Sequence, residues 1–161
     1  MVKTVYLSLG ANLGNRQQNL RVAIEHLGPA GITVRRVSSI YETEPLDLAG
    51  QPMFLNLVVE AETALMPLQL LSRTLRIERE LGRKRAVPKG PRTIDIDIVL
   101  YGSSVINTPE LVVPHPRLAE RRFVLEPLAE LAPDLRHPVT RRTVREMLAG
   151  VAAQKIRKTA L

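Results

Sequence analysis

Apolar and polar residues repeat along the chain with two periods, and each period predicts one kind of element. The apolar stripe of the first helix, at helical spacing, consists of Leu20, Ala23, Ile24 and Leu27. Asn15 is a suitable N-cap for this helix, with Gln18 three residues on to complete a capping box. Gly28 and Pro29 end it. The segment therefore predicts an amphipathic helix packed on a core.

The remaining elements follow from the same reasoning. Strands are expected over residues 2–9, 32–41, 54–61, 94–101 and 105–106. Further helices are expected over residues 67–81, 117–131 and 143–153. The order β-α-β-β-α-β, with additional helices at the C-terminal end, predicts a ferredoxin-like α+β fold: an antiparallel sheet with helices on one face. Without an internal repeat or a linker, residues 1–161 are expected to form a single domain.

Composition narrows the class of protein. The chain of 161 residues has no cysteine, which excludes a disulfide scaffold, a thiol nucleophile and a thiolate metal site. The lack of cysteine fits a cytoplasmic protein. The sequence shows no secretory signal and no apolar run of the roughly 20 residues that a membrane helix needs, so neither export nor a membrane span is expected. The net charge of +7 favours an anionic partner, and aromatic residues at 3% are few for a surface that stacks nucleic-acid bases. Phosphate held in a site is thus preferred, although a solvated basic surface would explain the charge equally well.

The most informative local feature is a pair of acids in the strand expected at 94–101. Asp95 and Asp97 share one strand face, and Ile94, Ile96 and Ile98 share the other. Neighbouring like charges destabilise a strand unless a cation neutralises them. Mg²⁺ is typically held by one or two carboxylates together with substrate phosphates. An exposed strand face paired with arginine is the alternative.

A basic segment leads directly into this acidic strand. Its cations are Arg83, Lys84, Arg85, Lys89 and Arg92. Arginine forks beside paired carboxylates suit a nucleotide carried with magnesium, because the forks bind phosphate oxygens and the carboxylates bind the metal. A solvated loop or a nucleic-acid patch would have a similar composition.

Other polar positions allow both a functional and a structural interpretation. Glu78 interrupts the apolar stripe expected at Leu71 and Leu75, where it would accept from a ligand or from an arginine of the next loop. His115 stands between two prolines that restrict its backbone, where it would face phosphate or form an ordinary loop hydrogen bond. Arg121 is expected to share a helical face with Arg117, either for phosphate or for solvent.

An aromatic ring and an amide project together from the strand expected at 54–61. Phe54 and Asn56, with Thr43 nearby in the sequence, would stack a flat heterocycle and hydrogen-bond its edge. Packing in the core would explain the same residues, and on these residues alone it is the better explanation. The chain contains no P-loop, so a bound nucleotide would be held by side chains and metal.

Taken together, these segments resemble the 6-hydroxymethyl-7,8-dihydropterin pyrophosphokinase family over nearly the whole chain. The most specific match is G-P-R-T-I-D-I-D at 90–97 followed by V-P-H-P at 113–116, with L-G-A-N-L-G at 9–14 and Q-P-M-F-L-N at 51–56 in support. The resemblance implies a ferredoxin-like fold and transfer of pyrophosphate from ATP to a pterin hydroxymethyl group, releasing AMP, in folate biosynthesis.

The resemblance also implies roles for individual residues. Two Mg²⁺ ions would be bound by Asp95 and Asp97. The catalytic residues would be Arg83, Arg92 and Asp97. ATP would be contacted by Glu78, Arg85, Arg92, Ile98, His115 and Arg121. The pterin pocket would be lined by Thr43, Leu46, Phe54, Asn56 and Phe123. The implied partners are ATP and a reduced pterin, with no nucleic acid, no membrane and no obligate protein partner.

Three positions depart from the family pattern. Lys89 stands where relatives commonly have Trp, Glu110 where an Arg can occur, and Leu75 where a Gln can. These departures concern the adenine contacts and loop closure, and they leave the acid pair intact.

Two other classes of protein remain as alternatives on the residues alone. A non-catalytic RNA-binding module would explain the basic charge, but an acid pair would repel its ligand in the absence of metal. A nucleotidyltransferase also uses paired aspartates and Mg-ATP, and it would release pyrophosphate instead of AMP.

Overall fold

A computed structural model describes residues 1–43, 53–82 and 93–159. Its strands are β1 (Lys3–Ala11), β2 (Ile32–Val37), β3 (Tyr41–Thr43), β4 (Phe54–Thr63), β5 (Asp95–Tyr101), β6 (Ile106–Asn107), β7 (Val112–Val113) and β8 (Arg157–Lys158). Its α-helices are α1 (Arg16–Leu27), α2 (Pro67–Glu80), α3 (Arg122–Leu131) and α4 (Val144–Ala149). Short 3₁₀ turns are η1 (Gly28–Ala30) and η2 (Leu118–Glu120). None of the helices in these ranges is long and apolar enough to cross a membrane.

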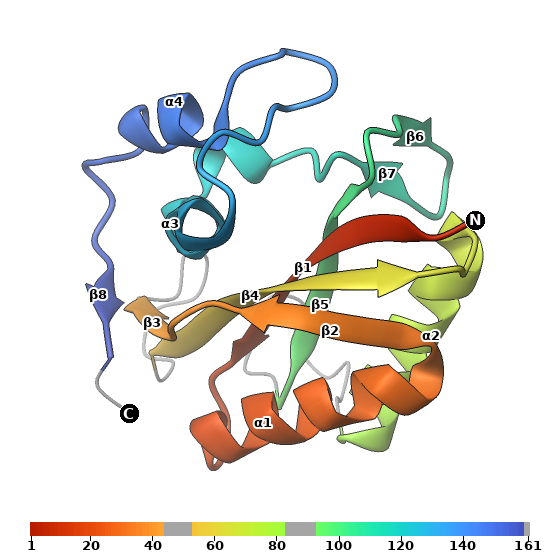
Figure 1. The fold of residues 1–161 in the computed structure, drawn as a ribbon. Coiled ribbons are helices and arrows are strands. Elements are labelled where there is room, and N and C mark those ends of the chain that lie inside the picture. The colour runs from red at the N-terminus through yellow and green to blue at the C-terminus, as the bar shows by residue number, and fades with distance from the viewer. Residues whose placement is uncertain (44–52, 83–92, 160–161) are drawn as a thin grey trace.

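The main sheet is antiparallel and follows the order β5-β1-β4-β3-β8. β1 and β4 lie in its middle, and β2 pairs with the second half of β4 while β3 pairs with the first half (Figure 1). The predicted ferredoxin-like α+β fold is therefore confirmed. The C-terminal strand β8 adds to the outer edge of β3, a pairing that the sequence pattern did not indicate.

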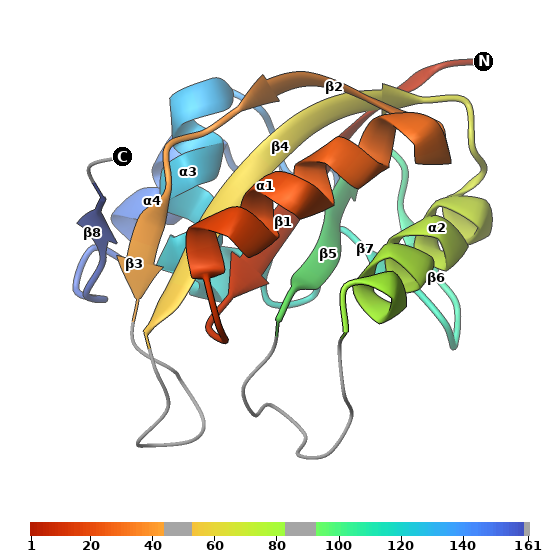
Figure 2. The same ribbon diagram turned by 90° about the horizontal axis from the view of Figure 1, so that it is seen from below.

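Helices cover both faces of the sheet. α1 and α2 pack on one face, as Figure 2 shows, and α3 and α4 lie on the other. The first face buries the larger apolar cluster, which includes Leu7, Leu9 and Leu57 from the sheet. The second buries a smaller cluster around Leu125 and Leu128 of α3. Two helices on one face were expected, and the additional C-terminal helices cover the opposite face.

The first helix forms as its pattern predicts. The Asn15 side chain accepts a hydrogen bond from the backbone amide of Gln18 at 3.1 Å. The Gln18 side chain does not complete the expected capping box, because it accepts from Arg21 instead. Leu20, Ala23 and Leu27 are buried, so the stripe faces the core as predicted. After η1 the chain turns at Gly31, whose φ of 92° lies in the left-handed region that favours glycine.

The strand expected over residues 32–41 is in fact two strands. β2 ends at Val37 and β3 begins at Tyr41. Between them the Ser38 hydroxyl accepts a hydrogen bond from the amide of Val58, in place of a main-chain carbonyl. A side chain that takes over a ladder position in this way interrupts the strand locally.

The helix expected over residues 117–131 is also divided. η2 ends at Glu120, and the backbone of Arg121 is extended, with φ −121° and ψ 100°. Its carbonyl then accepts from Val124 and Leu125 as α3 begins. Arg117 and Arg121 therefore do not share a face of one helix, contrary to expectation. The final helix begins as expected, where Thr143 and Glu146 form a capping box, but it ends at Ala149 instead of residue 153. Beyond this point the amides of Gly150 and Val151 bond to carbonyls only three residues back, so the chain continues as turns.

A carboxylate of α3 fixes this helix to the sheet. Glu130 accepts hydrogen bonds from the hydroxyl of Tyr41 and from the amide and hydroxyl of Ser39. Three donors on one carboxylate hold the end of α3 over the start of β3. This contact determines the position of the helix that begins beside Arg121.

Candidate active site

The acid pair lies on the face of β5 that points away from the larger core. Ile96 and Ile98 are buried at 5% and 4% exposure in the cluster under α1 and α2. Asp95 and Asp97 alternate with them and are half-buried on the other face. The predicted arrangement of acids and isoleucines is confirmed, because successive side chains of a strand point to opposite faces.

Ile98 itself cannot offer its side chain to a nucleotide bound at the acids. That side chain lies in the core on the opposite face of the strand. Only the main chain of Ile98 remains for the contact with ATP that the resemblance implies.

A buried carboxylate of α2 supports the acid strand from beneath. Glu78 is 2% exposed, and its Oε2 accepts a hydrogen bond of 2.6 Å from the amide of Ile96, the residue between the two aspartates. The sequence suggested a ligand or a loop arginine as the partner of Glu78 and did not indicate this main-chain amide; the arginines at 83, 85 and 92 lie outside the described residues. The fully buried residues of α2 are Leu70, Thr74, Ile77 and Glu78. Leu71 and Leu75 of the expected stripe are half-buried, and Leu71 packs against the same core. The signal for the true contact was that a buried acid needs a donor.

Arg121 joins the acid strand to the start of α3. Its Nη1 lies 3.8 Å from Oδ2 of Asp97, and its guanidinium carbon lies 5.4 Å from the centre of the Phe123 ring. A cation over an aromatic face is held in place by the ring's charge distribution. The extended backbone at Arg121 thus brings together three residues that the resemblance implied: Asp97, Arg121 and Phe123.

The second part of the site is the carboxamide of Asn56 in β4, two strands away from the acids of β5. Asn56 and Thr43 are buried at 4% and 6% exposure, and Nδ2 of Asn56 donates to Oγ1 of Thr43 over 2.8 Å. In β1, Gly10 is paired with Asn56 on one side and with Asp95 on the other. Asp95, Gly10 and Asn56 therefore form a row across three neighbouring strands, which we call the sheet row.

His115 closes the acid side of the site. Its amide donates to the carbonyl of Val99 in β5, and its Nδ1 accepts from the amide of Arg117 at 3.1 Å. Burial is the main cause that lowers the pKa of His115 to about 4; the positive charges of Arg121 and Arg117 act in the same direction, and Asp95 acts in the opposite one. The imidazole is therefore neutral at neutral pH, and its accepting Nδ1 leaves the proton on Nε2.

Several expected site residues lie outside the described residues. They are Leu46, Arg83, Arg85 and Arg92, together with Lys89. Among the described ones, the structure brings Asp95, Asp97, Arg121, Phe123 and His115 together at β5, and Thr43 and Asn56 together at β4.

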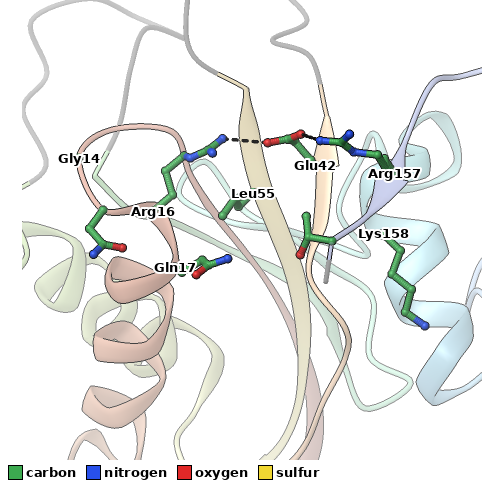
Figure 3. Close-up of a pocket in the computed structure, with 9 residues that line it drawn as sticks. Gly14, Arg16, Gln17, Glu42, Leu55, Arg157 and Lys158 are labelled. Atoms are coloured by element: carbon green, nitrogen blue, oxygen red, sulfur yellow. Dashed lines mark hydrogen bonds and ion pairs between the residues drawn. The ribbon is translucent and has the colours of Figure 1, made fainter. Parts of the chain in front are cut away.

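A separate cavity of about 590 Å³ opens on the opposite face of the sheet, between the start of α1 and β8. Figure 3 shows Glu42 between two arginines there: Arg16 at 3.2 Å, and Arg157. Arg16 also donates to the carbonyl of Met53 over 2.7 Å. Leu55, which lines this cavity, alternates along β4 with Asn56, so the cavity and the sheet row occupy different faces.

The described fold is shared with part of a longer protein of known structure. The HPPK-DHPS protein of Plasmodium falciparum, in a crystal structure with pteroate, superimposes with a TM-score of 0.74 at 16% identity. The match covers 93% of this chain and 42% of that one. At this identity the likeness concerns the fold alone.

Sequence comparison then identifies the family. The model of the 7,8-dihydro-6-hydroxymethylpterin-pyrophosphokinase (HPPK) family matches residues 6–133. The 2-amino-4-hydroxy-6-hydroxymethyldihydropteridine pyrophosphokinase of Bacillus subtilis is 48% identical over 141 residues, which cover 87% of this chain and 84% of that protein. The enzyme of the same name from Pseudomonas aeruginosa is 41% identical over 159 residues and 98% of both chains. This chain belongs to the HPPK family.

Other relatives are much longer proteins. The folic acid synthesis protein fol1 of Pneumocystis carinii is 49% identical over 138 residues, and the match spans 86% of this chain but only 19% of fol1. Beyond the family match, β8 pairs with β3, so residues after 133 still contribute to the sheet in this chain.

Proposed function

We propose that this chain transfers a pyrophosphoryl group from ATP to the hydroxymethyl group of 6-hydroxymethyl-7,8-dihydropterin, with release of AMP, in folate biosynthesis. The family and its bacterial members are named for this transfer. The observation in the chain that supports it best is the sheet row, which has a carboxylate strand at one end and a buried amide at the other.

Magnesium is the metal that suits the carboxylate end. Asp95 and Asp97 offer oxygen ligands from one face of one strand, and Mg²⁺ takes its remaining ligands from phosphates and water. The donor set fits the two ions that the family resemblance implies. When bound, magnesium supplies positive charge to the polyphosphate oxygens.

The bond changes of the transfer define what the protein must hold. The hydroxymethyl oxygen loses its proton to solvent or to a base and forms a bond to the β-phosphorus. The bond from that phosphorus to the α,β-bridging oxygen breaks, and the bridging oxygen leaves with AMP. Arg121, which lies beside Asp97, would hydrogen-bond phosphate oxygens on which charge accumulates. Fixed reactants lower the barrier further by removing the entropic cost of alignment.

The amide end is proposed to hold the pterin. Asn56, oriented by Thr43, would hydrogen-bond the edge of the flat ring, and Phe54 and Phe123 would contact its faces. Leu46 is proposed to complete this pocket. Glu78 is proposed to contact ATP in addition to accepting the hydrogen bond from the amide of Ile96.

The cations before β5 are proposed to act on the triphosphate. Arg83 and Arg92 would stabilise the transferring group, and Arg85 would bind ATP. The neutral His115 would donate from Nε2 to a phosphate oxygen. A cytoplasmic location and the absence of an obligate protein partner also remain predictions.

The decisive experiment measures products from Mg-ATP and 6-hydroxymethyl-7,8-dihydropterin. We expect AMP and the pterin pyrophosphate; release of inorganic pyrophosphate would instead indicate a nucleotidyltransferase. Asp97→Ala is expected to abolish turnover without unfolding the protein, because its side chain lies outside the larger core. Asp134→Ala is the matched control, since Asp134 is 82% exposed and pairs only at the surface with Arg145. A fully active Asp97→Ala enzyme would contradict the proposed role of the acid pair.

A further inference from the structure

Gly10 lies at the centre of the sheet row, although its backbone conformation does not require glycine. It lies within β1, paired on both sides, and its φ is outside the left-handed region where glycine is favoured. A glycine inside a strand weakens the strand, and it often marks a place where another group approaches closely. A neighbouring group occupies the space above Gly10.

The neighbouring amide is that group. A Cβ atom at position 10 would lie 2.8 Å from Oδ1 of Asn56, and the next closest atom would be Cδ1 of Phe54 at 3.6 Å. The contact with Oδ1 is closer than real Cβ contacts, so an alanine would force the carboxamide to move. The ring of Phe54, by contrast, is at an ordinary van der Waals distance.

The carboxamide of Asn56 has little freedom to move. Its Nδ2 donates to Oγ1 of Thr43 over 2.8 Å, and both side chains are buried. Rotation of the amide away from a Cβ at position 10 would lengthen or break this hydrogen bond. Gly10 and Thr43 therefore fix the two ends of the same amide: Thr43 binds the nitrogen, and the empty space over Gly10 admits the oxygen.

We propose that Gly10 is a positioning residue for pterin specificity, which directs Oδ1 of Asn56 as an acceptor toward an N–H group on the edge of the heterocycle. This inference rests on the proposed function. It adds a residue that has no side chain to touch a substrate and that would act through Asn56. A pterin ring carries N–H donors on its pyrimidine edge, and a misdirected acceptor there leaves a buried donor without a partner. Nucleotide binding at Asp95 and Asp97 uses the other end of the row and does not depend on the amide.

The test is the variant Gly10→Ala, with ATP and pterin affinities measured separately by calorimetry, and KM and kcat measured for each substrate. We expect the Kd for pterin to rise by about tenfold or more, the scale of one misplaced hydrogen bond, with the ATP affinity within about twofold of the parent. Gly28→Ala is the matched control, because a Cβ at position 28 meets nothing within 4 Å. It should leave both affinities unchanged.

A double-mutant cycle distinguishes positioning from general damage. In an Asn56→Ala background, Gly10→Ala should weaken pterin binding no further, because the amide through which it acts is gone. An equal loss in both backgrounds, a pterin affinity unchanged by Gly10→Ala, or a parallel loss of ATP binding would each overturn the inference. A parent enzyme that forms no AMP would instead refute the proposed function, so the two failures are separable.

Discussion

The neutral state of His115 makes the stability of the ligand-free protein depend on pH in a defined direction. Its pKa falls from 6.5 in an unfolded chain to about 4 in the folded protein, because the ring is buried and Arg121 is close. Between these two values the unfolded chain binds more protons than the folded one. The free energy of unfolding must therefore decrease as the pH is lowered through this window, and the contribution of His115 is fully present above it.

The size of the effect follows from the two pKa values. At about pH 5 they correspond to a loss of about 2 kcal/mol relative to neutral pH. The ring is only partly buried, so solvent screening reduces the expected loss to about 1 kcal/mol. Protonation of Nδ1 would also remove the acceptor for the amide of Arg117. The loss of this hydrogen bond likewise lowers the free energy of unfolding as the pH falls.

The assay is denaturant unfolding of the parent and of His115→Asn across this pH range. The amide oxygen of Asn can still accept from Arg117 but does not titrate, so the difference between the two proteins isolates the imidazole. We expect the parent to lose stability relative to the variant as the pH falls. An NMR titration of His115 near its ordinary pKa, or a difference that does not change with pH, would refute the reasoning.

Three further predictions concern stability and rate. Glu78→Ala should lower the free energy of unfolding by about 1–3 kcal/mol, because the buried amide of Ile96 loses its acceptor, whereas Glu78→Gln should cost less; equal losses in denaturant melts would contradict this. Asn15→Ala should cost about 1 kcal/mol in the same melts through loss of the α1 cap, and an unchanged midpoint would argue against the cap. Arg92→Ala should reduce kcat by about 10²–10³, as for loss of one donor to a developing oxyanion, and full activity in steady-state assays would exclude its proposed role.

Much of the site could be anticipated because its parts are encoded by local sequence. The alternation of acids and isoleucines through Asp95 and Asp97 determines which face carries the carboxylates, since a strand has a side-chain period of two. The acceptor for the Ile96 amide was not predictable in the same way. Glu78 is 18 residues away in the chain, and only the packing of α2 against β5 brings it there.

Arg121 gives the complementary case. Helical spacing suggested a shared face with Arg117, and the structure breaks the helix between them. Periodicity cannot reveal such a break, because residues on both sides remain compatible with a helix. The extended backbone at Arg121 is what places its guanidinium beside Asp97 and the Phe123 ring.

By itself, the order of apolar and polar residues determined the element types, the α+β class and the orientation of the acids, because these depend on interactions over a few residues. The family motifs indicated the chemistry. Only the tertiary structure decided that Gly10 separates Asp95 from Asn56 and leaves room for the amide oxygen. Strand register depends on pairing between distant segments, and no local pattern records which residues will lie side by side.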